Sequence, residues 1–223
     1  MSDKILGTEV ISKYFNNLNE IQISQFDKIG KLYPEWNAKI NVISRQDIDN
    51  LYVNHILHSL SIAKFFTPVS GTTFLDMGTG GGFPGIPLAI LFPDCTFHLI
   101  DRIGKKIRVA QSIAEDIGLK NVTFQHGDIG ECRAKYDFVV SRAVMRLDAL
   151  VPLIKKNVAR ENKNSICNGL ICLKGGNLAS ETDSVENASH SKTTSVIQQN
   201  ISDYFTEDFF ETKKIIYVPY IDF

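Results

Sequence analysis

The chain has 223 residues, of which 43% are hydrophobic and 22% are charged, and its formal net charge is -1. These values exclude a largely disordered chain and predict one main domain with an appendage. The near-neutral charge neither favours nor excludes a nucleic-acid partner, because a polyanion needs only one basic face.

Residues 4–67 are predicted to be helical. Between residues 24 and 36 the apolar side chains recur at helical spacing, and Ser24 with Asp27 fits a capping box. Ser44 and Asp47 repeat this start signal ahead of a second apolar face. The two faces contain Phe26, Ile29, Tyr33 and Trp36, then Ile48, Leu51, His55, Ile56 and Leu60. We therefore expect a helical N-terminal extension over residues 1–70.

Residues 71–223 are predicted to form an α/β domain. Short apolar runs alternate there with amphipathic helices, a pattern typical of a parallel sheet. The polar residues 177–200 indicate a mobile or weakly helical surface segment, and residues 213–218 a last strand antiparallel to its neighbour. The other predicted strands cover residues 73–77, 96–101, 122–125, 136–140 and 169–173, with helices starting near Pro84, Gly104 and Leu147.

A carboxylate and a glycine-rich turn follow the first predicted strand. Asp76 precedes Gly78, while Gly80, Gly82 and Gly85 also satisfy the dinucleotide pattern G-x-G-x-x-G. An aspartate at this place would repel a pyrophosphate, whereas S-adenosylmethionine carries a sulfonium and an ammonium that a carboxylate attracts. The turn therefore predicts S-adenosylmethionine as the cofactor, with a dinucleotide or a plain glycine turn as alternatives.

Two further loops are candidates for the same cofactor. Asp101 closes the second strand, where its carboxylate can accept hydrogen bonds from both ribose hydroxyls. Asp128, Ile129 and Gly130 follow the third strand and can meet the adenine. The alternative for these three residues is a plain turn that Asp128 caps.

Arg142 follows the fourth strand and is expected beside the reactive methyl group. The chain has neither a D/N-P-P-Y/F run nor a Pro-Cys nucleophile, which disfavours exocyclic amines and cytosine C5 as targets. An arginine suits a ring nitrogen with a free lone pair such as guanine N7, because it can hold O6 during the reaction. The alternative is a structural ion pair with Asp76, Asp137 or Asp148.

The remaining composition excludes several site classes. No run of about eighteen apolar residues occurs and no secretory signal begins the chain, so we expect a cytoplasmic protein without a membrane partner. The cysteines lack the spacing of a zinc site, so no metal is expected and the thiols fit a reducing compartment. They are Cys95, Cys132, Cys167 and Cys172.

These motifs together resemble the bacterial RsmG family, formerly called glucose-inhibited division protein B. The resemblance covers most of residues 30–176. It implies a class I S-adenosylmethionine-dependent methyltransferase fold, a Rossmann-like, doubly wound, mostly parallel seven-stranded sheet. It is carried by Trp36-Asn37, Asn41-Val42-Ile43, His55-Ile56-Leu57-His58-Ser59-Leu60, the segment from Asp76 to Pro87, Ser141-Arg142-Ala143 and Leu173-Lys174-Gly175-Gly176.

The resemblance also implies an activity and its site. The activity is methylation of N7 of guanine 527 in the 530 loop of 16S ribosomal RNA, with S-adenosylmethionine as donor. The implied cofactor pocket contains Gly78, Phe83, Ile129, Gly130 and Arg142, and the residues implied to face the base or the RNA are Asn41, His55, Arg142 and Lys174. Without the family, His55 is interpreted as a satisfied core histidine.

Two positions depart from the family pattern. His58 replaces an aspartate, and Asp128-Ile129-Gly130 replaces Arg-x-Glu, so one basic contact is missing. These departures put the roles of individual residues in doubt and leave the class unchanged.

The implied partner is 16S ribosomal RNA, as free RNA, in the 30S subunit or in an assembly intermediate, and the protein is expected to be a monomer. A loop guanine fits because a duplex base must first be flipped out. Candidate phosphate contacts, or merely solvated helix faces, are Lys105, Lys106 and Arg108, then Lys155, Lys156, Arg160 and Lys163. Competing functions are methylation of another RNA, a protein or a small molecule, and a non-catalytic module that binds the cofactor or RNA.

Overall fold

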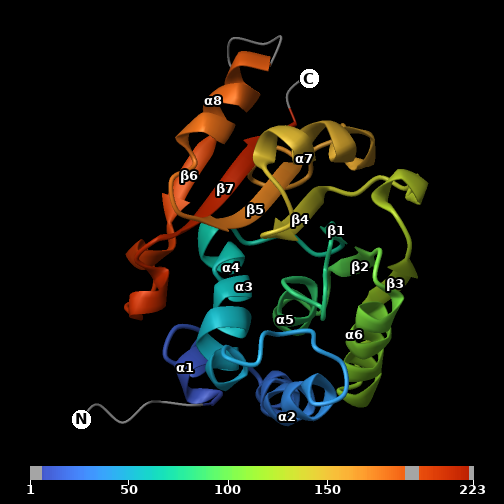
Figure 1. Cartoon of the computed structure of the whole chain (residues 1–223), viewed down its shortest axis with the longest axis vertical. Coiled ribbons are helices and arrows are strands. Elements are labelled where there is room, and N and C mark those ends of the chain that lie inside the picture. Colours follow the sequence, from blue (N-terminus) through green and yellow to red (C-terminus); the bar gives the residue numbers. More distant parts are fainter. Residues whose placement is uncertain (1–6, 189–195, 221–223) are drawn as a thin grey trace.

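The computed structural model describes residues 7–188 and 196–220. A seven-stranded sheet of order β3-β2-β1-β4-β5-β7-β6 forms its centre (Figure 1). The first five strands in this order are mutually parallel, and β7 runs antiparallel to β5 and β6. The expected doubly wound, mostly parallel seven-stranded sheet is therefore confirmed. Its strands are β1 Thr73–Met77, β2 Thr96–Asp101, β3 Val122–His126, β4 Phe138–Arg142, β5 Gly169–Gly175, β6 Ile197–Asn200 and β7 Lys213–Pro219.

Most of the strand predictions agree with the structure to within two residues. The prediction for β4 began two residues early, because Tyr136 forms only an isolated bridge with Val158. Asp137 is turned toward Thr73, whose backbone N–H donates to the Asp137 carboxylate at 2.7 Å. Regular pairing with β1 consequently starts at Phe138.

The polar segment over residues 177–200 contains two elements. It forms helix α8, Ala179–Ala188, and the edge strand β6, while residues 189–195 lie outside the described residues. The prediction missed β6 because an edge strand with one covered side has no run of apolar residues. Ile197 itself is 43% exposed.

The N-terminal region is helical, but its first long helix begins earlier than predicted. Asn19 caps α2, since its side chain accepts from the Gln22 N–H while the Gln22 side chain accepts from the Asn19 N–H. The expected cap at Ser24 is therefore wrong, and Ser24 lies inside the helix. The region contains α1 Glu9–Ser12, α2 Glu20–Asn37, a 3-10 turn Ile48–Asn50, a π-helical turn Leu51–Leu57, α3 His58–Leu60 and α4 Ile62–Phe65.

The second expected capping box, Ser44 with Asp47, is also wrong. Asp47 makes no capping hydrogen bond, and its carboxylate instead accepts hydrogen bonds from the side chains of Asn54 and His55. The chain enters its helix through the 3-10 turn and then widens into the π-helical turn. This departure from a regular helix places His55 within hydrogen-bonding distance of Asp47.

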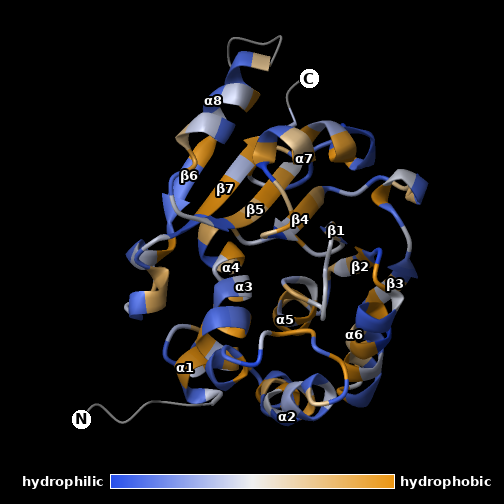
Figure 2. Ribbon diagram, in the orientation of Figure 1, coloured by the Kyte–Doolittle hydropathy of each residue, from blue (hydrophilic) through white to orange (hydrophobic). Residues whose placement is uncertain are grey.

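Helices cover both faces of the sheet, as Figure 1 shows. On one face, Phe74, Phe97 and Phe138 share an apolar core with the N-terminal helices, α5 (Gly85–Leu91) and α6 (Gly104–Asp116). On the other face, alternate residues such as Leu75 and Val139 pack with α7 (Leu147–Ile154) and α8. The expected starts of α5, α6 and α7 are confirmed to within a residue. In Figure 2 the hydrophobic residues accordingly gather along the central strands.

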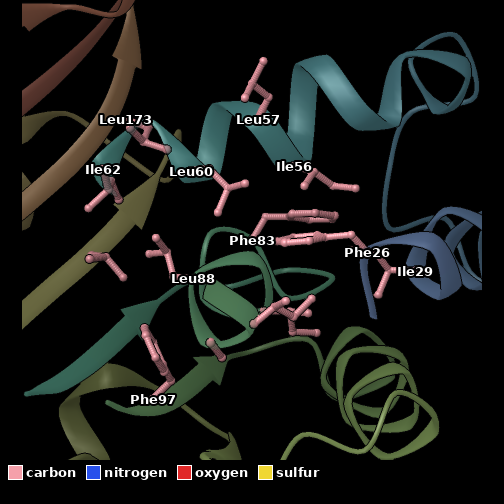
Figure 3. Close-up of a cluster of buried hydrophobic side chains, with 14 of the residues drawn as sticks. Phe26, Ile29, Ile56, Leu57, Leu60, Ile62, Phe83, Leu88, Phe97 and Leu173 are labelled. Atoms are coloured by element: carbon pink, nitrogen blue, oxygen red, sulfur yellow. The ribbon is translucent and has the colours of Figure 1, made fainter. Parts of the chain in front are cut away.

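The core that includes the N-terminal helices reaches the glycine turn. Figure 3 shows Phe26 of α2, Ile56 and Leu60 in one cluster with Phe83, which follows β1. Burial of each such side chain contributes about 1.5–3 kcal/mol, so this contact fixes the N-terminal helices over the turn. The division of the chain at residue 70 stays a prediction. None of the helices in the described ranges is long and apolar enough to cross a membrane.

Candidate functional site

A cavity of about 540 Å³ opens at the carboxyl ends of the parallel strands. Here the chain order reverses between β1 and β4, the place where doubly wound sheets bind ligands. Loops following four strands contribute to its wall, and Val42 reaches it from the N-terminal region. Among the lining residues are Gly78, Thr79, Gly80, Phe83, Asp101, Lys106, Gly127, Ile129, Arg142, Ala143 and Met145.

The glycine turn after β1 needs glycine for conformation and for space. Gly78 has φ +71°, and a Cβ there would lie 2.6 Å from the Val144 side chain. Gly80 has φ +58°, a backbone conformation that other residues adopt only with strain. Both line the cavity, whereas Gly82 lies away from it, against Ile86 and Tyr33. Gly78 and Gly80 therefore let a ligand approach the backbone.

Asp76 lies beneath this turn and does not line the cavity. One carboxylate oxygen accepts from the Thr79 hydroxyl at 2.6 Å and from the Gly85 N–H at 2.7 Å. The other oxygen is buried and has no hydrogen-bond partner among the described residues. Burial raises the pKa of Asp76 to about 7, although both hydrogen bonds act in the opposite direction. These two hydrogen bonds indicate that Asp76 stabilises the conformation of the glycine turn.

Asp101, at the end of β2, presents its carboxylate to the cavity. One oxygen accepts from the Gly80 N–H and the other from the Ile103 N–H, each at 2.8 Å. Each oxygen keeps a second lone pair, so this oriented carboxylate can still accept hydrogen bonds from two ribose hydroxyls. Asp101 thus ends β2 and lines the cavity, and its contact with a ribose stays a prediction.

The loop after β3 contributes backbone and one apolar side chain. Gly127 and Ile129 line the cavity, but Asp128 and Gly130 do not. Asp128 caps a 3-10 turn, accepting from the Gly130 N–H at 2.7 Å, and it ion-pairs with Arg102. The backbone hydrogen bond and the Arg102 guanidinium lower the pKa of Asp128. The Asp128 side chain therefore caps a turn, which is the alternative interpretation of this loop from the sequence.

Arg142 reaches the cavity from the end of β4 and has no carboxylate partner among the residues that the structure describes. Its guanidinium donates to the Asn54 carbonyl at 3.2 Å and to His55 Nδ1 at 2.9 Å. It also lies 4.9 Å from the centroid of the Phe83 ring. Burial lowers the pKa of Arg142 to about 10, so the group stays charged at neutral pH.

The expected alternative of a structural ion pair for Arg142 is wrong within residues 7–188 and 196–220. Asp137 pairs with Lys163 and Asp148 with Arg146, while Asp76 accepts from the turn it braces. The positive charge of Arg142 is therefore not neutralised by a contacting acid.

His55 lies between Arg142 and an acidic side chain. Its Nε2 is 2.6 Å from a carboxylate oxygen of Asp47, and its ring centroid is 5.4 Å from that of Phe83. Burial and the charge of Arg142 lower the pKa of His55 to about 4, so the imidazole is neutral at pH 7. His55 does not line the cavity itself, but it contacts Arg142, which does, so its expected role at the site stays a prediction.

The structure places Asn41 and Lys174 differently from His55. Asn41 is exposed, and only its neighbour Val42 lines the cavity. Lys174 donates to the Met145 carbonyl at 2.9 Å and to the Glu181 carboxylate at 2.8 Å. The Lys174 and Glu181 side chains are only 11% and 9% exposed, so this pair restrains the loop after β4.

The sequence analysis assigned no role at the site to three residues that lie near it. Asp47 resembled a cap signal, Glu181 lay in a segment interpreted as polar surface, and Tyr33, which donates to the Gly81 carbonyl at 2.8 Å, resembled a core residue. His58, at the position of the family aspartate, is buried, and its ring makes a T-shaped contact with that of Phe209. Only contacts between distant segments reveal these placements.

The lysine and cysteine candidates differ in whether they reach the cavity. Lys106 lines the cavity, whereas Lys156 donates to the Gly130 carbonyl at 2.7 Å and Lys163 pairs with Asp137. Cys167 is exposed and the other three cysteines are buried, all as free thiols. In the part of the chain that the structure describes, no group of three or more His, Cys, Asp or Glu side chains could hold a metal ion.

Comparisons with known proteins identify close relatives. A model of the GidB family, described as rRNA small subunit methyltransferase G, matches residues 22–207. The ribosomal RNA small subunit methyltransferase G of Phocaeicola vulgatus is 56% identical over 94% of this chain and 97% of its own length. That of Porphyromonas gingivalis is 50% identical, over 96% of this chain and 94% of its own.

Solved structures share the fold. A magnesium protoporphyrin IX methyltransferase from Synechocystis with bound S-adenosylmethionine has a TM-score of 0.56 at 19% identity, over 95% of this chain and 96% of that one. A S-adenosylmethionine-dependent methyltransferase from Aquifex aeolicus has a TM-score of 0.53 at 17% identity, over 79% of this chain and 98% of that one. At these identities the likeness extends to the fold alone.

Proposed function

Because the chain belongs to the GidB family of rRNA small subunit methyltransferases, we propose that it methylates N7 of guanine 527 in the 530 loop of 16S ribosomal RNA. S-adenosylmethionine is the methyl donor of this family and supplies an electrophilic methyl group on a sulfonium. The observation that carries the proposal is Arg142, a charged guanidinium that lines the cavity without a carboxylate partner among the described residues.

The residues around the cavity fit the donor. Gly78 and Gly80 leave their backbone accessible, and the Asp101 carboxylate is oriented by two N–H groups with acceptor capacity to spare for ribose hydroxyls. Ile129 offers an apolar surface for the adenine. Asp76 holds the turn in shape from below through Thr79.

Guanine N7 needs no general base, because its lone pair is free before the reaction. The protein must therefore hold the base in line with the methyl group, and positioning supplies most of the rate gain. Arg142 can donate to guanine O6, which fixes the ring and leaves N7 free to attack. A donor at N7 would block the reaction, so O6 is the contact that we assign to Arg142.

The substrate presents this guanine from a loop, where the base can leave its stack at small cost. We propose that the reaction takes place in the cytoplasm on the 30S subunit or on an intermediate of its assembly. Lys106 lies at the cavity and is the best placed of the lysine candidates for a contact with RNA phosphate.

The test combines nucleoside mass spectrometry with purified protein. Cells lacking the protein should lose 7-methylguanosine from 16S ribosomal RNA, and the purified protein should restore it on free RNA, 30S subunits or assembly intermediates. Arg142→Ala should reduce methyl transfer at least 100-fold, as loss of a preorganised hydrogen-bond donor does elsewhere. Arg133→Ala removes an exposed arginine away from the cavity and serves as the control.

Three outcomes would contradict the proposal. Unchanged 7-methylguanosine in the deleted strain would exclude this reaction. Methylation of free nucleosides or small molecules, but never of RNA, would indicate another substrate class. Donor binding by calorimetry with no methylated product in any RNA pool would indicate a binding module.

A further inference from the structure

Asp47, His55 and Arg142 form a continuous hydrogen-bonded chain that ends at the cavity. The Asp47 carboxylate lies 2.6 Å from His55 Nε2, and His55 Nδ1 lies 2.9 Å from a guanidinium nitrogen of Arg142. Asp47 comes from the loop before the 3-10 turn, His55 from the π-helical turn and Arg142 from the end of β4. Three separate elements therefore meet in one line of contacts.

Only one tautomer of neutral His55 satisfies both contacts. A guanidinium has donors and no acceptor, so Nδ1 must accept from Arg142 and carries no proton. The proton is then on Nε2, where it donates to the Asp47 carboxylate, which accepts and cannot donate when ionised. The opposite tautomer would point an N–H at Arg142 and leave a lone pair facing the acid.

We propose that Asp47 is a positioning residue for methyl transfer, which keeps the His55 proton on Nε2 so that Nδ1 holds the Arg142 guanidinium at the cavity. The inference rests on the proposed function for the role of Arg142 toward the substrate base. Asp47 itself does not line the cavity and acts through His55.

The neutral acceptor has a chemical advantage over an acid. A carboxylate in contact with Arg142 would orient it too, but would also neutralise the charge that is available to the substrate. A neutral imidazole nitrogen accepts one guanidinium N–H and leaves that charge in place. The acidic member of the chain is instead one imidazole ring away from Arg142.

The π-helical turn holds both acceptors of Arg142 side by side. The carbonyl of Asn54 accepts one arm of the guanidinium and the next residue, His55, accepts the other. The Asn54 side chain also donates to the second carboxylate oxygen of Asp47. Burial disfavours the ionised acid, but hydrogen bonds from Asn54 and His55 offset that effect and lower the pKa of Asp47. Both oxygens of Asp47 are thus engaged by adjacent residues of one turn.

The first experiment compares Asp47→Asn with the wild type. An asparagine can present either its amide oxygen or its amide nitrogen to Nε2, so it no longer holds the ring proton on that atom. In the fraction of molecules in which the amide nitrogen donates to Nε2, the ring proton lies on Nδ1 and faces Arg142. We expect kcat to fall roughly 10- to 100-fold, the range found for partners that orient metal-bound histidines. The Kd for the donor, from calorimetry, should change less than about twofold. Asp49→Asn, an exposed acid in the adjoining 3-10 turn, is the matched control and should leave kcat unchanged.

The second experiment locates the ring proton directly. Nitrogen-15 NMR of histidine-labelled protein distinguishes a protonated from an unprotonated ring nitrogen, and His55→Asn assigns the His55 signals among the 5 histidines. We expect the proton on Nε2 alone in the wild type, and a measurable fraction of ring protonated on Nδ1 in Asp47→Asn. Wild-type protein with the proton on Nδ1 would overturn the proposal, whether or not any variant folds.

A double-mutant comparison separates positioning from a general structural role. His55→Asn places an amide oxygen near the former Nδ1, an acceptor that needs no second partner to select it. In that background Asp47→Asn should cause no further loss of kcat, whereas an equal further loss would contradict the proposal. If the wild type methylates no RNA, the proposed function fails, and the ring-proton measurement still tests the Asp47 contact.

Discussion

Asp76→Asn tests the energetic consequence of a buried acid beneath the glycine turn. The replacement has nearly the same size, and its amide oxygen can accept from both the Thr79 hydroxyl and the Gly85 N–H. Its amide nitrogen takes the place of the buried oxygen that has no partner among the described residues. The change therefore removes an ionisable group and keeps the hydrogen bonds of the turn.

The expected effect depends on pH in a defined direction. Burial raises the pKa of Asp76 from 3.8 to about 7. Below pH 3.8 the carboxyl group is protonated in both folded and unfolded chains, so its titration does not change the free energy of unfolding. As pH rises toward 7, the unfolded chain releases the proton while the folded chain keeps it, so stability is lost. The interval corresponds to on the order of 4 kcal/mol, at about 1.36 kcal/mol per pH unit.

Urea unfolding without cofactor measures this difference. The stability of Asp76→Asn minus that of the wild type should rise by on the order of 4 kcal/mol between pH 4 and pH 8, because asparagine does not titrate. Asp94→Asn, an exposed acid beyond α5, controls for the loss of one negative charge. A difference that is the same at every pH would refute the reasoning, since Asp76 would then not titrate in this interval.

Two further changes test the loop after β4. Ala143 has φ +52°, so Ala143→Gly should relieve backbone strain. Glycine also raises the conformational entropy of the unfolded chain, so the net gain in the free energy of unfolding, measured with urea, should be about 0.5–1 kcal/mol. A loss of stability would contradict this reasoning. Lys174→Met leaves the buried Glu181 carboxylate without its ion pair and should destabilise the fold by about 3 kcal/mol. Unchanged stability with weakened RNA binding would instead indicate that Lys174 faces the RNA.

The sequence alone determined the parallel strands, to within two residues, and the glycine turn, because both depend on local features. Buried parallel strands are short apolar runs, so the bounds of β1 and β2 agree with the prediction to the residue. The turn after β1 needs positive φ at closely spaced positions, which the glycines there signal directly. Asp101 and Arg142 were predictable for the same reason, since each ends a strand at the edge where ligands bind.

Only the tertiary structure decided what the polar side chains contact. Asp47 and Ser24 are of residue types that commonly cap helices. In the structure, however, α2 packs against α5 and is capped at Asn19, while the chain enters the next helical region through a 3-10 turn in which Asp47 makes no capping hydrogen bond. Lys174 meets Glu181, and His55 meets Arg142, across elements that are distant in the chain. Such pairs leave no periodic signal, because a hydrogen bond depends on the direction and distance of two groups that the folded core brings together.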